Sequence, residues 1–331
     1  MRHARTGVRA LWVPALALAT AAGLGACTQQ ADVAGPTSAQ APGSSTGSGG
    51  LSPSAPSSNC DGKVNTPGGA DPWGTCWPGP GNTGPTTDDA LQVRTGDIAI
   101  TQPGYVLNDV EVRGCITIAA GANDVVIRNV RVKADCAYLI LNDAGATGLK
   151  VIDSELDGNS FVQNNAAVSG TNFTLERVNV HDVGDGIKAG SGVLIKDSYL
   201  HTLNITADSH NDAIQSLDAV GLTIDHNTVM LQDGATACII LSQNSGPDWQ
   251  MRDVSISRNL LAGGAYAIYG GYETGRDDPL RASDIVVSDN RISTVTFPRG
   301  GAYGALTSVD APVVTTVGNL WADGPNSGLP L

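Results

Sequence analysis

Apolar and polar residues alternate in eight segments of this chain that share one frame. The frame reads apolar, any, apolar, any, any, Asn/Ser/Val, any, apolar. The first segment runs from Val125 to Val132, and the others begin at Leu149, Phe173, Val193, Leu222, Val254, Ile285 and Val314. Alternation with a period of two is typical of β-strands. Recurrence of one frame every two to three dozen residues predicts a solenoid, in which each segment stacks on the next.

Two columns of the frame support this stacking. The sixth position reads Val130, Ser154, Val178, Ser198, Asn227, Asn259, Asn290 and Asn319. Four successive asparagines predict an internal ladder in which each side-chain amide bonds to the next coil. The fifth position reads Asp153, Arg177, Asp197, His226, Arg258 and Asp289 from the second segment on. We expect this column to be an exposed ladder of alternating charge, in which each pair contributes little energy.

A second strand-like run lies between successive frames. These runs are 185–188, 212–215, 237–240, 266–269 and 303–306. A leucine-rich repeat shares the spacing of the frame, but it has a helix or loop at this place and leucine at the apolar positions. Val and Ile dominate here. We therefore predict an all-β, right-handed parallel β-helix solenoid of about eight coils with an N-terminal cap.

The two-strand coil and the asparagine column, over about residues 105 to 325, resemble the pectate lyase-like superfamily of single-stranded right-handed parallel β-helix proteins. That superfamily includes polysaccharide lyases, polygalacturonase-type hydrolases, pectin esterases and phage tailspikes. The resemblance implies the fold and a carbohydrate-related role. Because one fold hosts several activities, the chemistry has to be argued from particular residues.

The first 59 residues differ in composition from the rest. Residues 1–26 have the basic start, short apolar stretch and small-residue exit of a signal peptide. Leu24-Gly25-Ala26-Cys27 resembles the bacterial lipobox, which implies lipidation of Cys27 and a membrane anchor on the extracellular face; ordinary secretion is the alternative. Residues 27–59 are rich in Ser, Gly and Pro and predict a flexible tether. We expect the cap over residues 60–104 and the β-helix over residues 105–331.

Charge and cysteine content narrow the possible partners. The formal net charge is −13, and it becomes −16 once Arg2, Arg5 and Arg9 leave with the signal peptide. A chain this acidic lacks the basic surface that binds nucleic acid. We therefore expect no nucleic-acid partner. Export permits disulfides. We expect two of them, formed by Cys60 with Cys76 and Cys115 with Cys136, and a buried free thiol at Cys238.

The second strand set brings together the residues that could carry chemistry. Residues at one register in successive coils lie about 4.8 Å apart. One register reads Asp185, Asp212, Ala237, Tyr266 and Tyr303, and the other reads Lys188, Gln215, Ile240, Tyr269 and Thr307, with Thr307 one residue out of register. Asp185 and Asp212 are thus expected side by side, with Lys188, Gln215 and His210 nearby. The alternative is that both aspartates only form turns, in which Asp accepts local backbone hydrogen bonds.

Two adjacent carboxylates repel, so either the pKa of one rises or a cation lies between them. With Ca²⁺ bound by Asp185 and Asp212, the pair would suit a lyase that removes the C5 proton of a uronate. Lys188 would then be the base or would neutralise the uronate charge, and His210 would be an auxiliary acid or base. With a shared proton, the pair would suit inverting hydrolysis, although that mechanism needs carboxyl groups about 6.5–9.5 Å apart.

Further residues are candidates for substrate binding. Tyr266 and Tyr269 could hold sugar rings by stacking, and Gln215 could bond to sugar hydroxyls. His181 and His201 end successive frames, so we expect them to stack on each other, as substrate-binding groups or as ordinary structure.

The sequence favours a lipid-anchored cell-surface protein that acts on a polysaccharide, foremost as a pectate lyase-like lyase. The alternatives are a non-catalytic glycan-binding or envelope-structural protein and an inverting glycosidase that uses the Asp pair. The negative net charge argues against a strongly anionic substrate, because long-range attraction would be absent.

Overall fold

The computed structural model describes residues 60–86, 91–243 and 248–331. These residues form 26 strands and no helix. The strands belong to two parallel sheets, one of 17 strands and one of nine. The predicted signal peptide, Cys27 and the tether lie outside the described residues.

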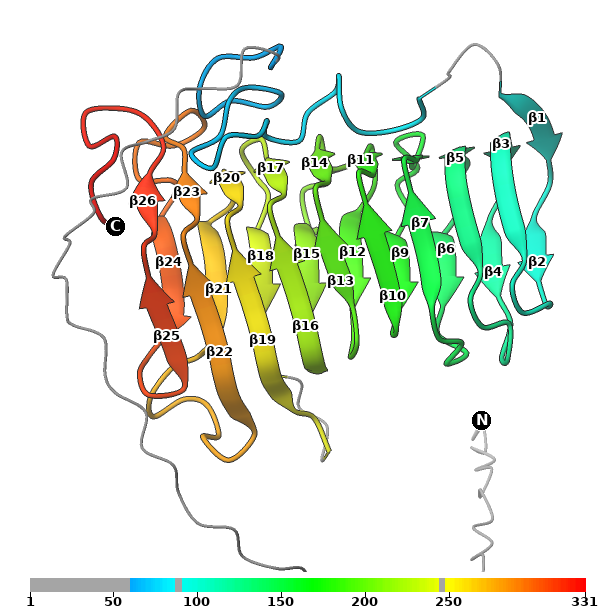
Figure 1. The fold of residues 1–331 in the computed structure, drawn as a ribbon. Helices are drawn as coiled ribbons and strands as arrows, with labels where there is room; N and C mark the ends of the chain where they lie inside the picture. Colours follow the sequence, from blue (N-terminus) through cyan, green and yellow to red (C-terminus); the bar gives the residue numbers. More distant parts are fainter. Residues whose placement is uncertain (1–59, 87–90, 244–247) are drawn as a thin grey trace, which may run out of the picture. The chain divides into compact units, whose positions relative to one another are not determined.

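The nine-stranded sheet receives one strand from each turn of the chain. Its members are β2 (Ile98–Ile100), β4 (Ile116–Ile118), β6 (Tyr138–Asn142), β9 (Ala166–Gly170), β12 (Asp185–Ala189), β15 (Asp212–Ser216), β18 (Ala237–Leu241), β21 (Tyr266–Tyr272) and β24 (Gly304–Val309). This is the second strand set of the sequence, and its strands lie in chain order (Figure 1).

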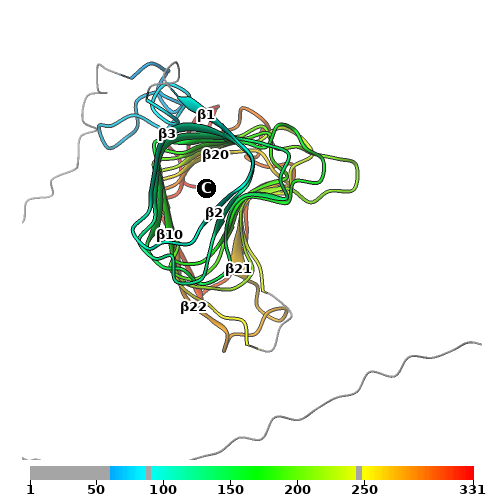
Figure 2. The same ribbon diagram turned by 90° about the vertical axis from the view of Figure 1, so that its right-hand side faces the viewer.

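The 17-stranded sheet contains the repeating frame. Its members are β1 (Gln92–Thr95), β3 (Val106–Arg113), β5 (Val126–Lys133), β7 (Leu149–Ile152), β8 (Glu155–Asp157), β10 (Phe173–Glu176), β11 (Asn179–His181), β13 (Leu194–Lys196), β14 (Tyr199–His201), β16 (Ala219–Asp225), β17 (Thr228–Met230), β19 (Met251–Ser257), β20 (Leu260–Ala262), β22 (Ala282–Ser288), β23 (Arg291–Ile292), β25 (Val314–Val317) and β26 (Leu320–Trp321). Leu222 pairs with Val254, and Val254 with Ile285, as the frame predicts. The stacked turns enclose one interior (Figure 2), an arrangement consistent with a β-solenoid.

The fifth position of the frame is a sharp turn. Its backbone φ is positive in all eight segments, from 48° at Asp153 to 68° at Gly318. This left-handed conformation is unfavourable for residues that have a β-carbon. Gly, which has none, adopts it readily, and Asn and Asp adopt it more easily than other residues do. Arg177 and Arg258 adopt it nevertheless, with φ of 54°. The conformation redirects the chain from one strand of the frame to the next, as from β10 to β11.

The asparagine column forms the predicted ladder beside this turn. Asn227, Asn259 and Asn290 each donate from Nδ2 to Oδ1 of the next asparagine, at 3.0, 2.9 and 2.9 Å. Each of these Oδ1 atoms also accepts the backbone N–H of the preceding asparagine. The backbone N–H groups of these asparagines are buried at the turn and have no partner in the strand pairing. The ladder supplies their hydrogen-bond acceptors.

The inward-facing apolar residues form one continuous core from Ile100 to Val314. Ile127, Val151, Leu175, Ile195 and Ile224 occupy the third frame position in successive turns, and all are fully buried. Ile256 and Val287 at the same position are also fully buried, which explains why this position is apolar in the first seven segments; in the last one it is the exposed Thr316.

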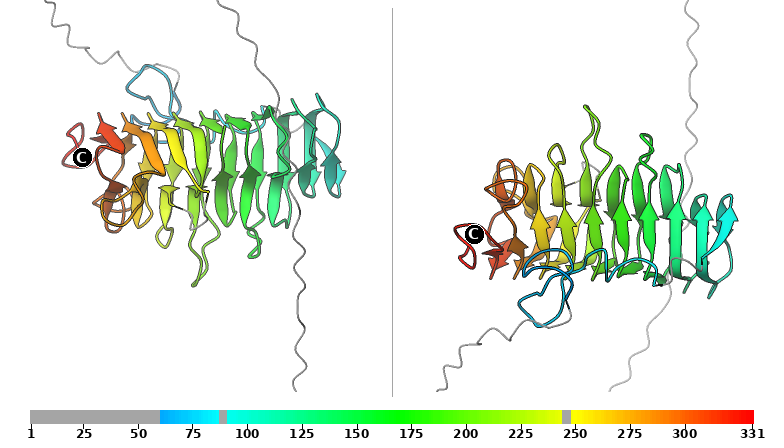
Figure 3. Two further views of the ribbon diagram at one scale, coloured as in Figure 1. Left: turned by 90° about the horizontal axis from the view of Figure 1, so that it is seen from below. Right: turned by 90° about the horizontal axis from the view of Figure 1, so that it is seen from above.

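Residues 60–86, which we call the N-terminal strap, lie along the 17-stranded sheet (Figure 3). Asn65 Nδ2 donates to the carbonyl of Ala322 at 2.9 Å, and Thr86 N donates to Asn129 Oδ1 at 2.8 Å. The strap therefore runs from the last turns back to an early one. The sequence predicted a cap over residues 60–104, but residues 92–95 and 98–100 already pair in the two sheets as β1 and β2. Strand pairing thus begins before the predicted boundary at residue 105.

Both predicted disulfides are present. Cys60 joins Cys76 within the strap, and Cys115 joins Cys136 in adjacent turns. Cys238 is a free thiol, fully buried as expected.

Candidate functional site

The register of β12 and β15 brings Asp185 and Asp212 together as predicted. Ile187 pairs with Ile214 and Lys188 with Gln215, which stacks the two aspartates in adjacent turns. Asp185 Oδ1 accepts the backbone N–H of Asp212 at 3.0 Å. Both aspartates are nearly buried, with only 6% and 2% of their surface exposed.

Asp212 has an unusual carboxyl group. Its Oδ2 accepts a hydrogen bond from Gln215 Nε2 at 3.0 Å, whereas its buried Oδ1 makes no hydrogen bond of normal geometry. Burial and the negative charge of Asp185 raise the pKa of Asp212 to about 7, against weaker opposing effects of Gln215, Lys188 and the Ala237 amide. Burial also raises the pKa of Asp185. Asp212 is thus a carboxyl group that can gain or lose a proton near neutral pH.

Lys188 makes two polar contacts beside this pair. Its Nζ lies 3.2 Å from Asp185 Oδ2 and also donates to Asn165 Oδ1. Asn165 in turn donates from Nδ2 to the hydroxyl of Tyr138. These contacts hold the cationic end of Lys188 beside the Asp pair, a position that suits neutralisation of an anion.

The predicted Ca²⁺ does not fit the oxygens of this pair. Calcium takes six to eight oxygen ligands. Asp185 uses both carboxylate oxygens, one for the Asp212 N–H and one for Lys188, and Asp212 uses Oδ2 for Gln215. The Lys188 ammonium lies where a second cation would have to bind.

A surface depression of about 440 Å³ adjoins the ends of β9, β12 and β15. The side chains of Ser169, Lys188 and Gln215 line it, together with Asp143 and Asp218. The backbone of Gly170 and Gly190 completes part of the wall. Polar side chains at the ends of three neighbouring strands are therefore accessible in this depression.

Three tyrosines lie farther along the same sheet. The rings of Tyr266 and Tyr269 are 5.3 Å apart and nearly perpendicular, and the ring of Tyr303 is 6.0 Å from that of Tyr266. Burial and the charge of Asp212 raise the pKa of Tyr269, which places this ring near the Asp pair. One register was wrong by a residue. Tyr266 pairs with Gly304 and Tyr269 with Thr307, so Thr307 is in register and Tyr303 is not.

His210 and the His181–His201 pair differ in their surroundings. His210 is exposed, two residues before Asp212, and bonds to none of the described residues. His181 and His201 stack as expected, with ring centroids 5.1 Å apart, but they end β11 and β14 of the 17-stranded sheet. No hydrogen bond or ion pair joins them to the Asp pair within the described part of the chain.

The surroundings of His181 form a charge network. Its nitrogens lie 3.0 Å from Glu155 Oε1 and 2.7 Å from Asp182 Oδ2, and although burial opposes protonation, these carboxylates raise its pKa. Asp157 is close enough to His181 and Asp182 for the three to share a metal ion. Lys133 pairs with Asp157, however, and both His181 nitrogens are already engaged. We interpret this network as structural.

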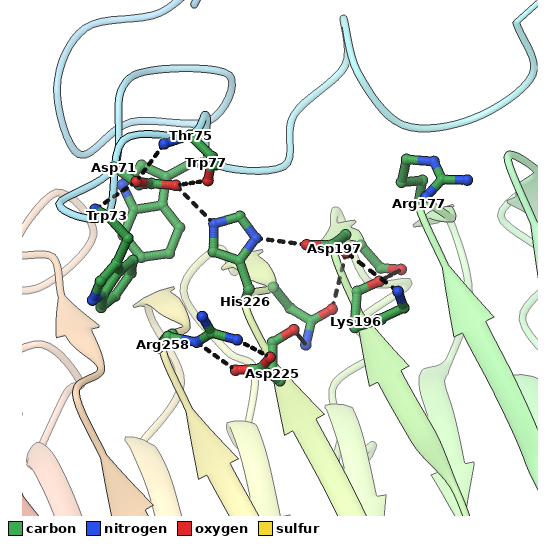
Figure 4. Close-up of polar contacts among 12 residues, drawn as sticks. Asp71, Trp73, Thr75, Trp77, Arg177, Lys196, Asp197, Asp225, His226 and Arg258 are labelled. Atoms are coloured by element: carbon green, nitrogen blue, oxygen red, sulfur yellow. Dashed lines mark hydrogen bonds and ion pairs between the residues drawn. The ribbon is translucent and has the colours of Figure 1, made fainter. Parts of the chain in front are cut away.

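Sequence reasoning missed a second cluster, at the strap (Figure 4). His226, at the fifth frame position, lies between two carboxylates, with Nε2 3.0 Å from Asp71 Oδ2 and Nδ1 2.7 Å from Asp197 Oδ1. Although burial opposes it, these carboxylates raise the pKa of His226 to about 9. The Trp77 ring stacks on His226 at 5.4 Å. The one sequence feature that could have indicated this cluster is the pair Trp73 and Trp77 in a Pro/Gly-rich segment, because large aromatic side chains in such a segment usually pack against another part of the protein.

The fold and this site define a class: an all-β protein of long parallel sheets with a polar and aromatic row on one of them. No family model, curated protein or solved structure matches the chain. The described residues contain no helix that is long and apolar enough to span a membrane.

Proposed function

We propose that this protein is an exported, right-handed parallel β-helix of the pectate lyase-like kind that cleaves a uronate-containing polysaccharide by β-elimination. The observation that carries the proposal is Lys188, which lines a surface depression and forms an ion pair with Asp185, next to Asp212, whose pKa is about 7. Pairs of ionisable groups with shifted pKa values are typical of catalytic sites.

Each residue has a defined part in the proposed reaction. The Lys188 ammonium neutralises the carboxylate of the uronate, which makes its C5 proton more acidic. His210 accepts that proton, and Asp212 donates its own proton to the glycosidic oxygen on C4. The C4–O bond then breaks and a C4–C5 double bond forms. Tyr266, Tyr269 and Gln215 hold the neighbouring sugars.

Location and anchoring belong to the same proposal. The lipobox-like residues before Cys27 support a lipid anchor, and the two disulfides suit an extracellular protein. Residues 27–59 would then hold the β-helix away from the membrane on its outer side.

A second candidate function is polysaccharide binding without cleavage. The near-complete burial of Asp185 and Asp212, with three of their four oxygens already engaged, favours this alternative. In it, the Asp pair positions Lys188 and Gln215 for recognition. Inverting hydrolysis is less well supported, because stacked strands about 4.8 Å apart leave little room for a water molecule between the carboxyl groups.

The products of cleavage distinguish these functions. The mature protein is incubated with a panel of uronate polymers, and both ultraviolet absorbance of the double bond and new reducing ends are measured. Absorbance that is lost in Lys188→Met and Asp212→Asn, but kept in Lys150→Met, supports the lyase; Lys150 is an exposed lysine of the other sheet. Reducing ends without absorbance would indicate hydrolysis, and binding without either signal would indicate the second candidate.

A further inference from the structure

The outer face of the nine-stranded sheet has a distinctive charge distribution. One row of in-register residues is Tyr138, Ala166, Asp185, Asp212, Ala237, Tyr266 and Gly304, and the other is Leu141, Ser169, Lys188, Gln215, Ile240, Tyr269 and Thr307. Lys188 is the one cation in these two rows. Because Lys188 also forms an ion pair with Asp185 of the first row, the face offers at most one positive charge to a bound polymer.

Acidic side chains lie on either side of that cation. Asp143 follows β6 and Asp218 follows β15, and both are exposed and line the same depression as Lys188. Asp143 accepts a hydrogen bond from Ser169 at 3.2 Å, and Asp218 accepts one from the Gln250 backbone at 3.0 Å, so both are held in place. A second carboxylate on a neighbouring sugar would meet like charge here.

The tyrosines offer a contact of another kind. Tyr269 lies three strand spacings from Lys188 in the same row, or about 14 Å. The rings of Tyr266, Tyr269 and Tyr303 are half-exposed or exposed and carry no positive charge. Such rings stack on the apolar face of uncharged sugars. The formal net charge of −13 adds long-range repulsion toward any polyanion.

We infer that the polymer bound on this face carries isolated uronates separated by uncharged sugars, and is not a homopolyuronate. The inference rests on the proposed function, because it names the substrate class of the same site. One uronate meets Lys188, and the sugars on both sides meet amides, hydroxyls and tyrosine rings.

The test varies carboxylate density while the sugar linkage stays constant. Polygalacturonate, alginate and polyglucuronate are each prepared in native, half carboxyl-reduced and fully carboxyl-reduced forms. Binding of each form to the mature protein is measured by calorimetry at low ionic strength, where charge effects are largest. We expect the half-reduced form of the best-bound polymer to bind about tenfold more tightly than the native form, and more tightly than the fully reduced one.

Variants assign the effect to named side chains. Lys188→Met should remove the advantage of the half-reduced over the fully reduced form, whereas Lys150→Met should keep it. The double variant Asp143→Asn plus Asp218→Asn should shift the optimum toward denser carboxylates, which a merely structural role would not do.

Two results overturn the inference in distinguishable ways. Tightest binding of a native homopolyuronate, or of a fully reduced polymer, refutes the substrate class and leaves the proposed polysaccharide site standing. Absence of binding to all nine preparations refutes the proposed function, and the inference with it.

Discussion

At the scale of single residues, burial and neighbouring charge give Asp212 and His226 opposite roles. Burial beside Asp185 raises the pKa of Asp212, so ionised Asp212 destabilises the fold. Two carboxylates raise the pKa of His226, so protonated His226 stabilises it. Both groups titrate within the range of ordinary buffers, and each makes a prediction with a definite sign.

Asp212→Asn should stabilise the protein above neutral pH. An unfolded Asp ionises near pH 4, whereas folded Asp212 stays protonated until about pH 7, so wild type loses stability as pH rises between these values. We expect a gain on the order of 2 kcal/mol at pH 8 that disappears by pH 4. Thermal unfolding across this pH range measures it, with the exposed Asp143→Asn as the control. A gain that is equal at all pH values would mean that folding does not raise the pKa of Asp212.

His226→Gln should destabilise the protein at neutral pH and hardly at all in strong alkali. Because the folded pKa of His226 is about 9, its stabilising effect is complete below about pH 6.5 and is lost as pH rises through 9. The expected loss at pH 6.5 is on the order of 2 kcal/mol. Tryptophan fluorescence during unfolding gives the readout, since Trp77 stacks on the imidazole. A difference that persists at pH 10 would contradict a charged His226.

At the scale of the structural element, each turn combines an unfavourable residue with a favourable one. The left-handed fifth position, occupied even by Arg177 and Arg258, is followed directly by the ladder position. Arg177 forms an ion pair with Asp153 of the preceding turn at 2.6 Å, as expected of the charge column. In the later turns, as at Arg258, the asparagine that follows satisfies buried backbone groups, which offsets the cost of the left-handed residue.

Asn259→Ala tests the contribution of the ladder. The substitution leaves the buried N–H of Asn227 without its acceptor and removes the bond from Asn259 Nδ2 to the Ile224 carbonyl. We expect a loss of about 2–3 kcal/mol in the free energy of unfolding. Denaturant unfolding measures it against Asn326→Ala, an exposed asparagine outside the ladder. Equal stability of the two variants would show that the ladder is dispensable.

At the scale of the whole described unit, strand pairing joins each turn only to the turns next to it. The N-terminal strap, in contrast, contacts turns that are far apart in the stack. Its Trp77 is fully buried and packs with Leu260 and Ala322, while Trp73 is 36% exposed and lies against Arg291. The strap thus covers apolar surface on several turns of the 17-stranded sheet.

Trp77→Ala should destabilise the protein far more than Trp73→Ala. Removal of a fully buried indole costs about 3–5 kcal/mol, whereas a partly exposed one contributes much less. Thermal unfolding compares the two variants, and limited proteolysis of residues 60–86 shows whether the strap detaches first. Similar melting temperatures for the two variants would mean that the strap adds no stability.

The sequence alone determined the repeating part of this protein. Spacing and alternation fix which residues stack, because a parallel strand pairs in register with the same position of the next turn. For this reason the strand sets, the Asn227–Asn319 ladder, the contact of Asp185 with Asp212 and the Cys115–Cys136 disulfide could be predicted. The one-residue error at Tyr303 occurred where the loop before β24 breaks the repeat.

Only the tertiary structure decided what lies over the stacked turns. Burial of the Asp pair, and with it the raised pKa of Asp212, could not be predicted from local spacing, because it depends on how the folded turns surround the two carboxyl groups. The strap has no repeat, so nothing in its sequence says which surface it covers. That choice depends on the fit of Trp77 and Asp71 to Leu260, Ala322 and His226, groups some 150 to 250 residues away in the chain that come together only in the folded structure.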